Sequence, residues 1–312
     1  MQLLITKFAI GSLILLFSTH LLVKLAERLS SAAKISPLIV GMTVVALGTS
    51  LPELAFSVTA LTQSDPGLAM GNIVGSNIVN ILLVLPIGIL IGKLRIGTTK
   101  TQRNAAFLLV VTAGFIYLQF SQYNHKVVGA IFILLAIVVT ILEYILGLEG
   151  QKNEDKKLFK YKRKVPLGII TIFGAPILIA GIAGGSYLAV GSVEGIAQAT
   201  GISTTILGLS LTAIVTSLPE LLTTIFSQEE HDGKLTIGNI LGSNLYNLLL
   251  IGGIVILVSG KNGLPVINWV ILGITTIIFI VMIGNYKGRN VPRVWGFFYF
   301  FLLAIYLFSL KY

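Results

Sequence analysis

The sequence predicts an all-α membrane protein of ten transmembrane helices, built as two inverted five-helix repeats in which the second and seventh helices are broken. The first observation is composition: of 312 residues, 55% are hydrophobic and only 11% are charged, whereas soluble domains carry about 25% charged residues. The second is a series of apolar stretches of about 20 residues, long enough to cross a bilayer core of about 30 Å. The third is an internal repeat that places a proline and a glutamate inside apolar segments.

Ten apolar segments are predicted to span the membrane, and they are residues 5–27, 36–62, 67–92, 104–121, 126–148, 166–190, 202–227, 234–259, 266–285 and 292–310. The first is interpreted as a membrane helix and not as a signal peptide, because its apolar run is long and lacks a small-residue cleavage site. The polar, strongly basic residues 149–165 separate the fifth segment from the sixth. They divide the chain into a first repeat, residues 1–148, and a second repeat, residues 166–312.

Two motifs of the first half recur in the second half at a constant offset. Thr-Ser-Leu-Pro-Glu ends at Glu53 and again at Glu220, and Gly-Asn-Ile-x-Gly-Ser-Asn begins at Gly71 and again at Gly238. The offset is 167 residues for both motifs, which excludes chance. Because each repeat contains five spans, an odd number, the second copy must enter the membrane with the opposite polarity. Inverted repeats with broken helices are typical of secondary transporters, whose substrate site lies near the membrane midplane.

Basic residues are distributed unequally between the two sides of the predicted bundle. With ten spans, 18 of the 22 lysines and arginines fall on the side of the 149–165 linker and 4 fall on the side of the termini. Such an excess marks the cytoplasmic side. We therefore expect a multi-pass cell-membrane protein with a cytoplasmic linker and both termini outside. The net charge of +10 has the same origin, so we expect contact with membrane lipid and not with nucleic acid.

The residue types needed for enzyme chemistry are scarce. The chain contains no cysteine, which excludes disulfides, thiolate metal sites and cysteine nucleophiles. Its three histidines lie in the first span or in loops, without the partners of a hydrolase site. We therefore expect no enzyme activity and no cofactor.

Two acidic residues, Glu53 and Glu220, fall in the middle of a span, whereas the other ten are predicted to lie in loops, as for Glu194, or near span ends. A carboxylate at the bilayer centre is costly and normally faces a cavity or a partner, and no lysine or arginine lies at a comparable depth. Two such groups repel each other unless a cation or a proton lies between them. The sequence therefore predicts a cation site, and two negative charges suit a divalent ion. The alternative, a protonated structural carboxyl, is disfavoured because both copies keep the group beside a helix break.

Each of these glutamates follows a helix-breaking proline. Pro52 cannot donate to the carbonyl of Gly48, and Pro219 cannot donate to that of Val215, so backbone oxygens are freed near the midplane. Such oxygens are tolerated when they are buried in protein or line a wet cavity. The motif hydroxyls precede the glutamates by three and four residues and share their helix face; they are Thr49, Ser50, Thr216 and Ser217. Hard oxygen ligands of this kind suit Ca²⁺ and Na⁺.

The second motif places polar residues at intervals of four, on one face of a helix. Four of them are assigned to the site, and they are Ser76, Asn80, Ser243 and Asn247. Asn72 and Asn239 stay undecided between the site and contacts between helices. The motif glycines are assigned to close helix packing.

With these paired motifs the sequence resembles the cation/calcium exchanger superfamily, most closely its prokaryotic sodium/calcium exchanger branch. The resemblance covers both halves. It implies an ion-binding core made of the second, third, seventh and eighth spans, and long, tilted first and sixth helices that slide to alternate access. It also implies roles for residues of this chain: calcium ligands at Glu53, Glu220, Thr49 and Thr216; sodium ligands at Ser50, Ser76, Ser217 and Ser243 and at the backbone oxygens of Ala46 and Ala213; and a central amide at Asn80.

Two positions depart from that family pattern. Asn247 stands where many sodium/calcium exchangers carry aspartate, which puts a third monovalent site or potassium dependence in doubt. Val215 stands where the motif has glycine, which alters the local backbone path without removing a ligand.

The expected function is antiport, in which Ca²⁺ or sodium ions occupy one overlapping cluster in a protein that works as a monomer. A proton/calcium exchanger using the same two glutamates is the main alternative. A passive cation channel is disfavoured by the inverted repeat, and a membrane enzyme is the remotest reading.

Overall fold

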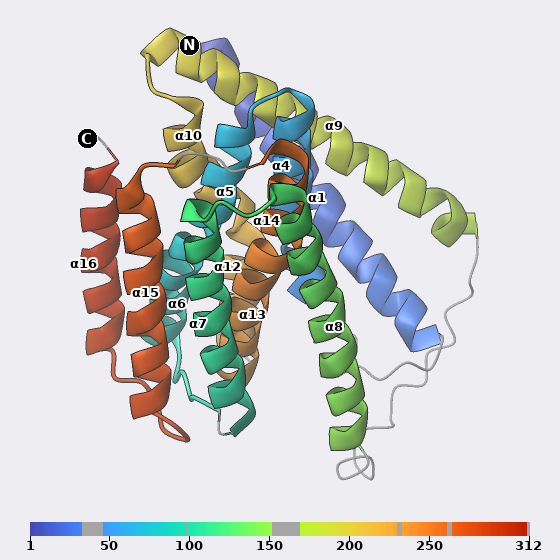
Figure 1. The fold of residues 1–312 in the computed structure, drawn as a ribbon. Coiled ribbons are helices and arrows are strands. Elements are labelled where there is room, and N and C mark those ends of the chain that lie inside the picture. The colour runs from blue at the N-terminus through green and yellow to red at the C-terminus, as the bar shows by residue number, and fades with distance from the viewer. Residues whose placement is uncertain (33–45, 98, 152–168, 230–232, 261–263, 311–312) are drawn as a thin grey trace.

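The computed structural model describes residues 1–32, 46–97, 99–151, 169–229, 233–260 and 264–310, and almost all of this chain is helical (Figure 1). Eight helices within these ranges are long and apolar enough to cross a membrane, and Leu51–Thr62 and Val294–Ser309 are shorter apolar helices. Helices satisfy their backbone hydrogen bonds internally, which the hydrocarbon core of a bilayer requires. The prediction of an all-helical membrane protein is therefore confirmed.

Six helices form the periphery of the bundle, and they are α1 (Gln2–Ala32), α7 (Thr99–Phe120), α8 (His125–Gln151), α9 (Ile169–Thr200), α15 (Val266–Asn285) and α16 (Val294–Ser309). Their outward faces expose large apolar side chains such as Phe17, Val110 and Phe297, which are 66–67% exposed. A surface of this kind suits contact with lipid. The first residue of α1 and the last of α16 lie at the same end of the bundle (Figure 1).

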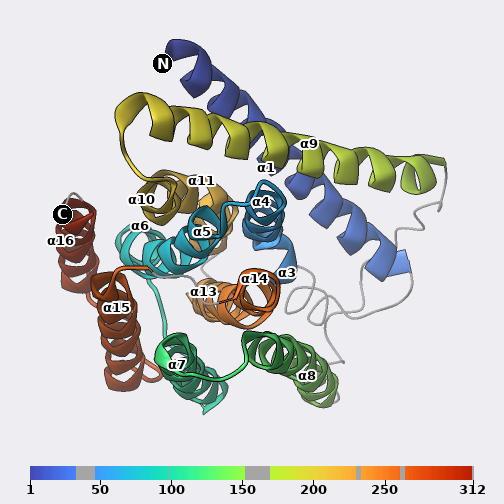
Figure 2. The ribbon, with the colours of Figure 1, turned by 45° about the horizontal axis from the view of Figure 1, so that its top comes forward.

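The interior consists of two helices that contain the repeated Gly-Asn-Ile-x-Gly-Ser-Asn motif. One is α5 (Pro66–Val79) with α6 (Leu85–Ile91), and the other is α13 (Gly233–Tyr246) with α14 (Gly252–Ser259). In their apolar windows 83% and 78% of the residues are buried, against 22–44% in the other long apolar helices. Figure 2 shows these helices between three flanks, formed by α7 and α8, by α15 and α16, and by α1 and α9.

Each interior helix contains a π-helical turn that the sequence analysis did not predict. The turns are Asn80–Val84 and Asn247–Ile251, and in each the carbonyl of the first residue accepts from an N–H five residues on. A third π-helical turn, Gly208–Thr212, lies between α10 (Thr204–Leu207) and α11 (Ala213–Thr216). Single π turns inside α-helices are frequent at functional sites. Here two of the three begin at an asparagine that the sequence assigns to the site.

The predicted breaks in the second and seventh spans are present. The short helix α3 (Ala46–Thr49) is followed by α4 (Leu51–Thr62), and α11 is followed by α12 (Leu218–Glu229). Ser50 and Ser217 lie at the breaks with φ, ψ of −86°, 5° and −80°, 6°. In each case the proline is the second residue of the new helix, where its missing N–H is tolerated. Residues 36–45 of the predicted second span lie outside the described residues.

The sixth predicted span, residues 166–190, is wrong at its end, because α9 continues to Thr200. Glu194, which was predicted to lie in a loop, is therefore a helical residue. Several glycines and Glu194 lower the hydropathy of this segment, although they do not stop the helix. A helix of 32 residues exceeds the length needed to cross a bilayer and tilts or protrudes. Residues 149–151 of the predicted linker belong to α8, which ends at Gln151, and residues 152–165 lie outside the described ranges.

The long helices α1 and α9 cross each other at one side of the bundle (Figures 1 and 2). Their contact is backbone against backbone. A Cβ atom on Gly11 would lie 2.8 Å from the backbone nitrogen of Ala189, and one on Gly185 would lie 2.6 Å from that of Leu15. The two helices therefore form one tightly packed pair.

The motif glycines allow a direct test of packing, because two equivalent positions differ. A Cβ atom on Gly71 would lie 2.6 Å from the carbonyl oxygen of Thr205, whereas no described atom lies within 4 Å of one on Gly238. The packing role is thus supported for Gly71 and not for Gly238.

We expect Gly71→Ala to destabilise the protein by about 1–3 kcal/mol through overpacking, seen as a lower Tm in tryptophan fluorescence of detergent-purified protein. Gly238→Ala is the matched control and should not lower the Tm. Equal Tm values for the two variants would contradict the packing described here.

Candidate functional site

The two membrane glutamates lie in the first turns of α4 and α12, directly after the helix breaks. Both Glu53 and Glu220 are 0% exposed. Their position follows from the local sequence, since Pro52 and Pro219 are the second residues of the new helices and the glutamate that follows each proline is buried. The fold therefore buries two carboxylates at equivalent places in the two halves.

The two halves exchange hydroxyl contacts with these carboxylates. Ser50 Oγ lies 3.4 Å from Glu220 Oε1, and Ser217 Oγ lies 3.3 Å from Glu53 Oε1. Each serine donates to the glutamate of the other half. The two breaks are therefore packed against each other, and the site needs both halves to form.

A second reciprocal pair connects the threonines of the breaks to the asparagines that begin the other motif. Thr49 Oγ1 donates to Asn239 Oδ1 at 3.3 Å, and Thr216 Oγ1 donates to Asn72 Oδ1 at 3.2 Å. Ser76 Oγ also lies 3.3 Å from Thr216 Oγ1. The structure thus brings Asn72 and Asn239, which the sequence left undecided, into contact with predicted site residues.

The amide of Asn80 connects the two interior helices. Its Nδ2 donates to Ser243 Oγ at 3.2 Å and to Asn244 Oδ1 at 3.0 Å. Asn244 Nδ2 in turn donates to the backbone oxygen of Asn77 at 3.3 Å. The sequence analysis missed Asn77 and Asn244, although both end the repeated Gly-Ser-Asn run and their shared offset was a usable signal. Asn244 therefore orients the amide of Asn80, and the backbone oxygen of Asn77 holds Asn244 in place.

Several oxygen atoms of this cluster are buried and have no hydrogen-bond partner among the described residues. They are Glu53 Oε2, Glu220 Oε2, Asn80 Oδ1 and Asn247 Oδ1. Helix α4, which carries Glu53, packs against the π-helical turn that begins at Asn247. Helix α12, which carries Glu220, packs against the π-helical turn that begins at Asn80. Burying a carboxylate or amide oxygen without a partner is costly, so each such atom in a native protein needs an explanation. Oxygen atoms of this kind are what a cation binds, whereas the amide nitrogen of Asn247, which also has no partner among the described residues, is not.

The donor set defines which cations suit the cluster. It offers carboxylate, hydroxyl and amide oxygens and no sulfur, and the side-chain hydrogen bonds described for the two glutamates come from hydroxyl groups. Oxygen-only sets suit hard cations such as Ca²⁺ and Na⁺. Ala213, the first residue of α11, is buried at 0% exposure, and Ala46 begins α3; the ligand role of their backbone oxygens stays a prediction.

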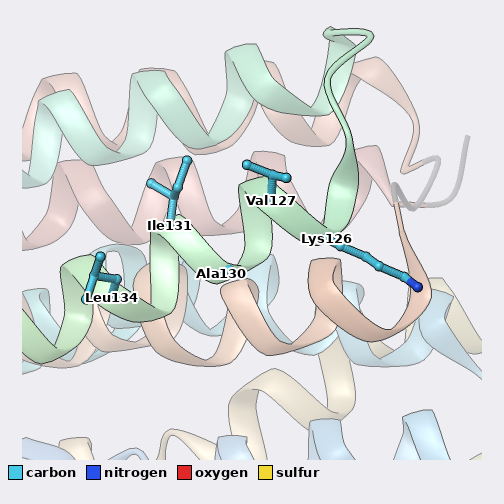
Figure 3. A pocket seen from close by; sticks show the side chains of 5 residues that line it. All are labelled: Lys126, Val127, Ala130, Ile131 and Leu134. Carbon is cyan, nitrogen blue, oxygen red and sulfur yellow. The ribbon is translucent and has the colours of Figure 1, made fainter.

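A hollow on the outer surface is unrelated to this cluster. It lies along α8 and is lined by Lys126, Val127, Ala130, Ile131 and Leu134 (Figure 3). Leu134 is 60% exposed and Val127 is 56% exposed. No carboxylate or hydroxyl side chain lines this hollow, so it is a groove of the apolar exterior and not an ion site.

The fold and the buried oxygen cluster define a membrane ion transporter. Comparison with known proteins agrees, since residues 3–145 and 170–311 match the family model described as sodium/calcium exchanger protein. The inner membrane protein YrbG of Escherichia coli (strain K12) is 32% identical over 260 residues, which are 80% of this chain and 78% of that protein. The sodium/calcium exchanger MaX1 of Methanosarcina acetivorans is 28% identical over 283 residues, or 78% and 80% of the two chains.

A solved structure is also similar. The sodium-calcium exchanger NCX_Mj, soaked with Na⁺ and Sr²⁺, matches with a TM-score of 0.68 and 25% identity over 98% of both chains. The chain therefore belongs to the sodium/calcium exchanger protein family, and it is a multi-pass membrane exchanger.

Binding of Ca²⁺ to the cluster can be tested through the melting temperature of the protein. If its unpartnered oxygens hold a divalent ion, Ca²⁺ raises the Tm of the purified protein, because a ligand that binds the folded state stabilises it. Glu53→Gln and Glu220→Gln should each abolish this rise, since the neutral amide removes one of two negative charges. Glu194→Gln makes the same chemical change in α9, outside the cluster, and should keep the rise. A calcium-dependent rise that survives in both site variants would contradict the site.

Proposed function

We propose that the protein is an antiporter that exchanges calcium for sodium across the membrane by alternating access. The observation that carries this proposal is the pair of buried glutamates, each with a carboxylate oxygen that lacks a partner among the described residues. One Ca²⁺ neutralises two carboxylates, and so do two sodium ions. With one Ca²⁺ or two Na⁺ bound, the charges of the two carboxylates are neutralised and the core can close over its ions. Closing the empty cluster is costly, because it leaves two negative charges buried and unpaired. This condition couples the two fluxes.

The individual ligand roles follow from donor chemistry and from the family. Carboxylates and the adjacent hydroxyls favour the divalent ion, so Glu53, Glu220, Thr49 and Thr216 are its ligands. Neutral oxygens favour sodium, and the proposed sodium ligands are Ser50, Ser76, Ser217, Ser243 and the backbone oxygens of Ala46 and Ala213. Asn80 and Asn247 contribute amide oxygens at the centre.

Alternating access requires two related halves, and we assign these to residues 1–148 and 166–312 as an inverted repeat. The reciprocal bonds from Ser50 to Glu220 and from Ser217 to Glu53 support this assignment, because an approximate twofold relation generates such pairs. The distribution of basic residues favours a cytoplasmic linker and both termini outside. A single chain contains the complete cluster, so a monomer suffices for exchange.

A transport measurement tests the counter-ion. In proteoliposomes with a matched membrane potential, an outward sodium gradient should drive uptake of ⁴⁵Ca, because the hydroxyl-rich cluster provides neutral sodium ligands. An outward proton gradient should drive little uptake. Uptake driven by protons alone would overturn sodium as the counter-ion and favour a proton/calcium exchanger that uses the same two glutamates.

A further inference from the structure

Two hydroxyl residues outside the ion cluster occupy equivalent places in the two halves. Thr19 lies in α1 and Ser186 lies in α9, and they are separated by the same 167 residues as Glu53 and Glu220. Both are buried, at 1% and 0% exposure. Each is thus the counterpart of the other on the two crossing helices.

Ser186 is bonded to the helix that carries Glu53. Its Oγ lies 2.8 Å from the carbonyl oxygen of Ala55 and 2.6 Å from Thr59 Oγ1, both in α4. Helix α9 passes over α4 at this contact (Figure 2). In this structure the second crossing helix is therefore held on α4 at a point close to the ion cluster.

Thr19 is in the opposite situation, since its Oγ1 has no partner among the described residues. By the offset, the counterparts of Ala55 and Thr59 are Leu222 and Phe226 on α12. These two side chains are 50% and 57% exposed. The face of α12 equivalent to the covered face of α4 is therefore open, and the hydroxyl that would bond to it is unused.

The crossing helices are packed too closely to move separately. Gly11 and Gly185 bring the backbones of α1 and α9 into direct contact. A shift that removes Ser186 from α4 therefore also moves Thr19.

We propose that Ser186 and Thr19 are alternating positioning residues, each of which holds the crossing helices against one half of the core. In the present access state Ser186 bonds to Ala55 on α4. In the opposite state Ser186 is released, and Thr19 donates to the carbonyl oxygen of Leu222 on α12. This inference rests on the alternating access of the proposed function, and it does not depend on which ions are exchanged.

The two states are balanced by similar contacts. Each state satisfies one hydroxyl and leaves its counterpart without a partner, so the difference between them is small, as a two-state element requires. The halves are not identical, because α4 offers the hydroxyl of Thr59 where α12 offers the phenyl ring of Phe226. The present state thus gains a polar contact, whereas the opposite state covers an exposed apolar side chain.

The absence of cysteine from the sequence allows a clean cross-linking experiment. The pair Thr59→Cys with Ser186→Cys reports the present state, and the pair Thr19→Cys with Phe226→Cys reports the opposite state. Each double variant is reconstituted without an ion gradient and treated with a mild oxidant, and the four single variants serve as controls. Both pairs should form an intramolecular disulfide that stops exchange, and reduction should restore it. If the 59–186 pair cross-links and the 19–226 pair does not under any ion condition, the proposal is overturned.

A second variant separates positioning from simple folding. Thr19→Val removes an unused hydroxyl from the present state and a hydrogen bond from the opposite state, so both effects favour the present state. It should shift the equilibrium between the two states toward the present state by about three- to tenfold, the range expected for one hydrogen bond, and so raise the cross-linking rate of the 59–186 pair. Thr19→Ser should restore the original rate, and Thr6→Val, the same change at an exposed site of α1, should have no effect. An unchanged rate in Thr19→Val would refute the role of Thr19. Because cross-linking needs no particular counter-ion, this failure is distinct from a failure of sodium/calcium exchange.

Discussion

The burial of two carboxylates inside an apolar bundle is the constraint on which the rest of the structure depends. Glu53 and Glu220 are fully buried, and each accepts a hydrogen bond from a serine of the opposite half. Hydroxyl donors lower the free-energy cost of burying a carboxylate, but they do not neutralise its charge. The site is therefore complete only when a cation or proton supplies the missing charge. A buried carboxylate pair that binds a cation without a permanent charged partner is suited to an exchanger, because an exchanger must both bind and release its ions.

The helix breaks and π-helical turns serve this constraint. A regular helix through Ser50 or Ser217 would use its backbone oxygens internally, whereas the prolines free them next to the glutamates. The π turns that begin at Asn80 and Asn247 change the helix face at the level of the cluster. The interior helices are thus irregular at the residues where polar groups gather.

The parts of this protein that could be predicted from the sequence are the repeated motifs and the polar residues that interrupt apolar spans. Glu53 and the break at Pro52 stand out because a costly group recurs at one offset. The partners of the site were harder to predict, since the bond of Thr216 to Asn72 depends on how the two halves pack. The π turns have no sequence pattern of their own, because their residues are as apolar as those of an α-helix. The end of α9 was misjudged because glycines lower hydropathy without ending a buried or tilted helix.

Ion competition at one cluster is the central claim of this account. The most direct test is equilibrium binding of ⁴⁵Ca to the purified protein at rising sodium concentration and constant ionic strength, with choline as the replacement cation. The account predicts saturable binding of calcium that sodium displaces completely and cooperatively, since more than one sodium ion is needed to neutralise Glu53 and Glu220. Calcium binding that is unaffected by sodium would contradict a shared site.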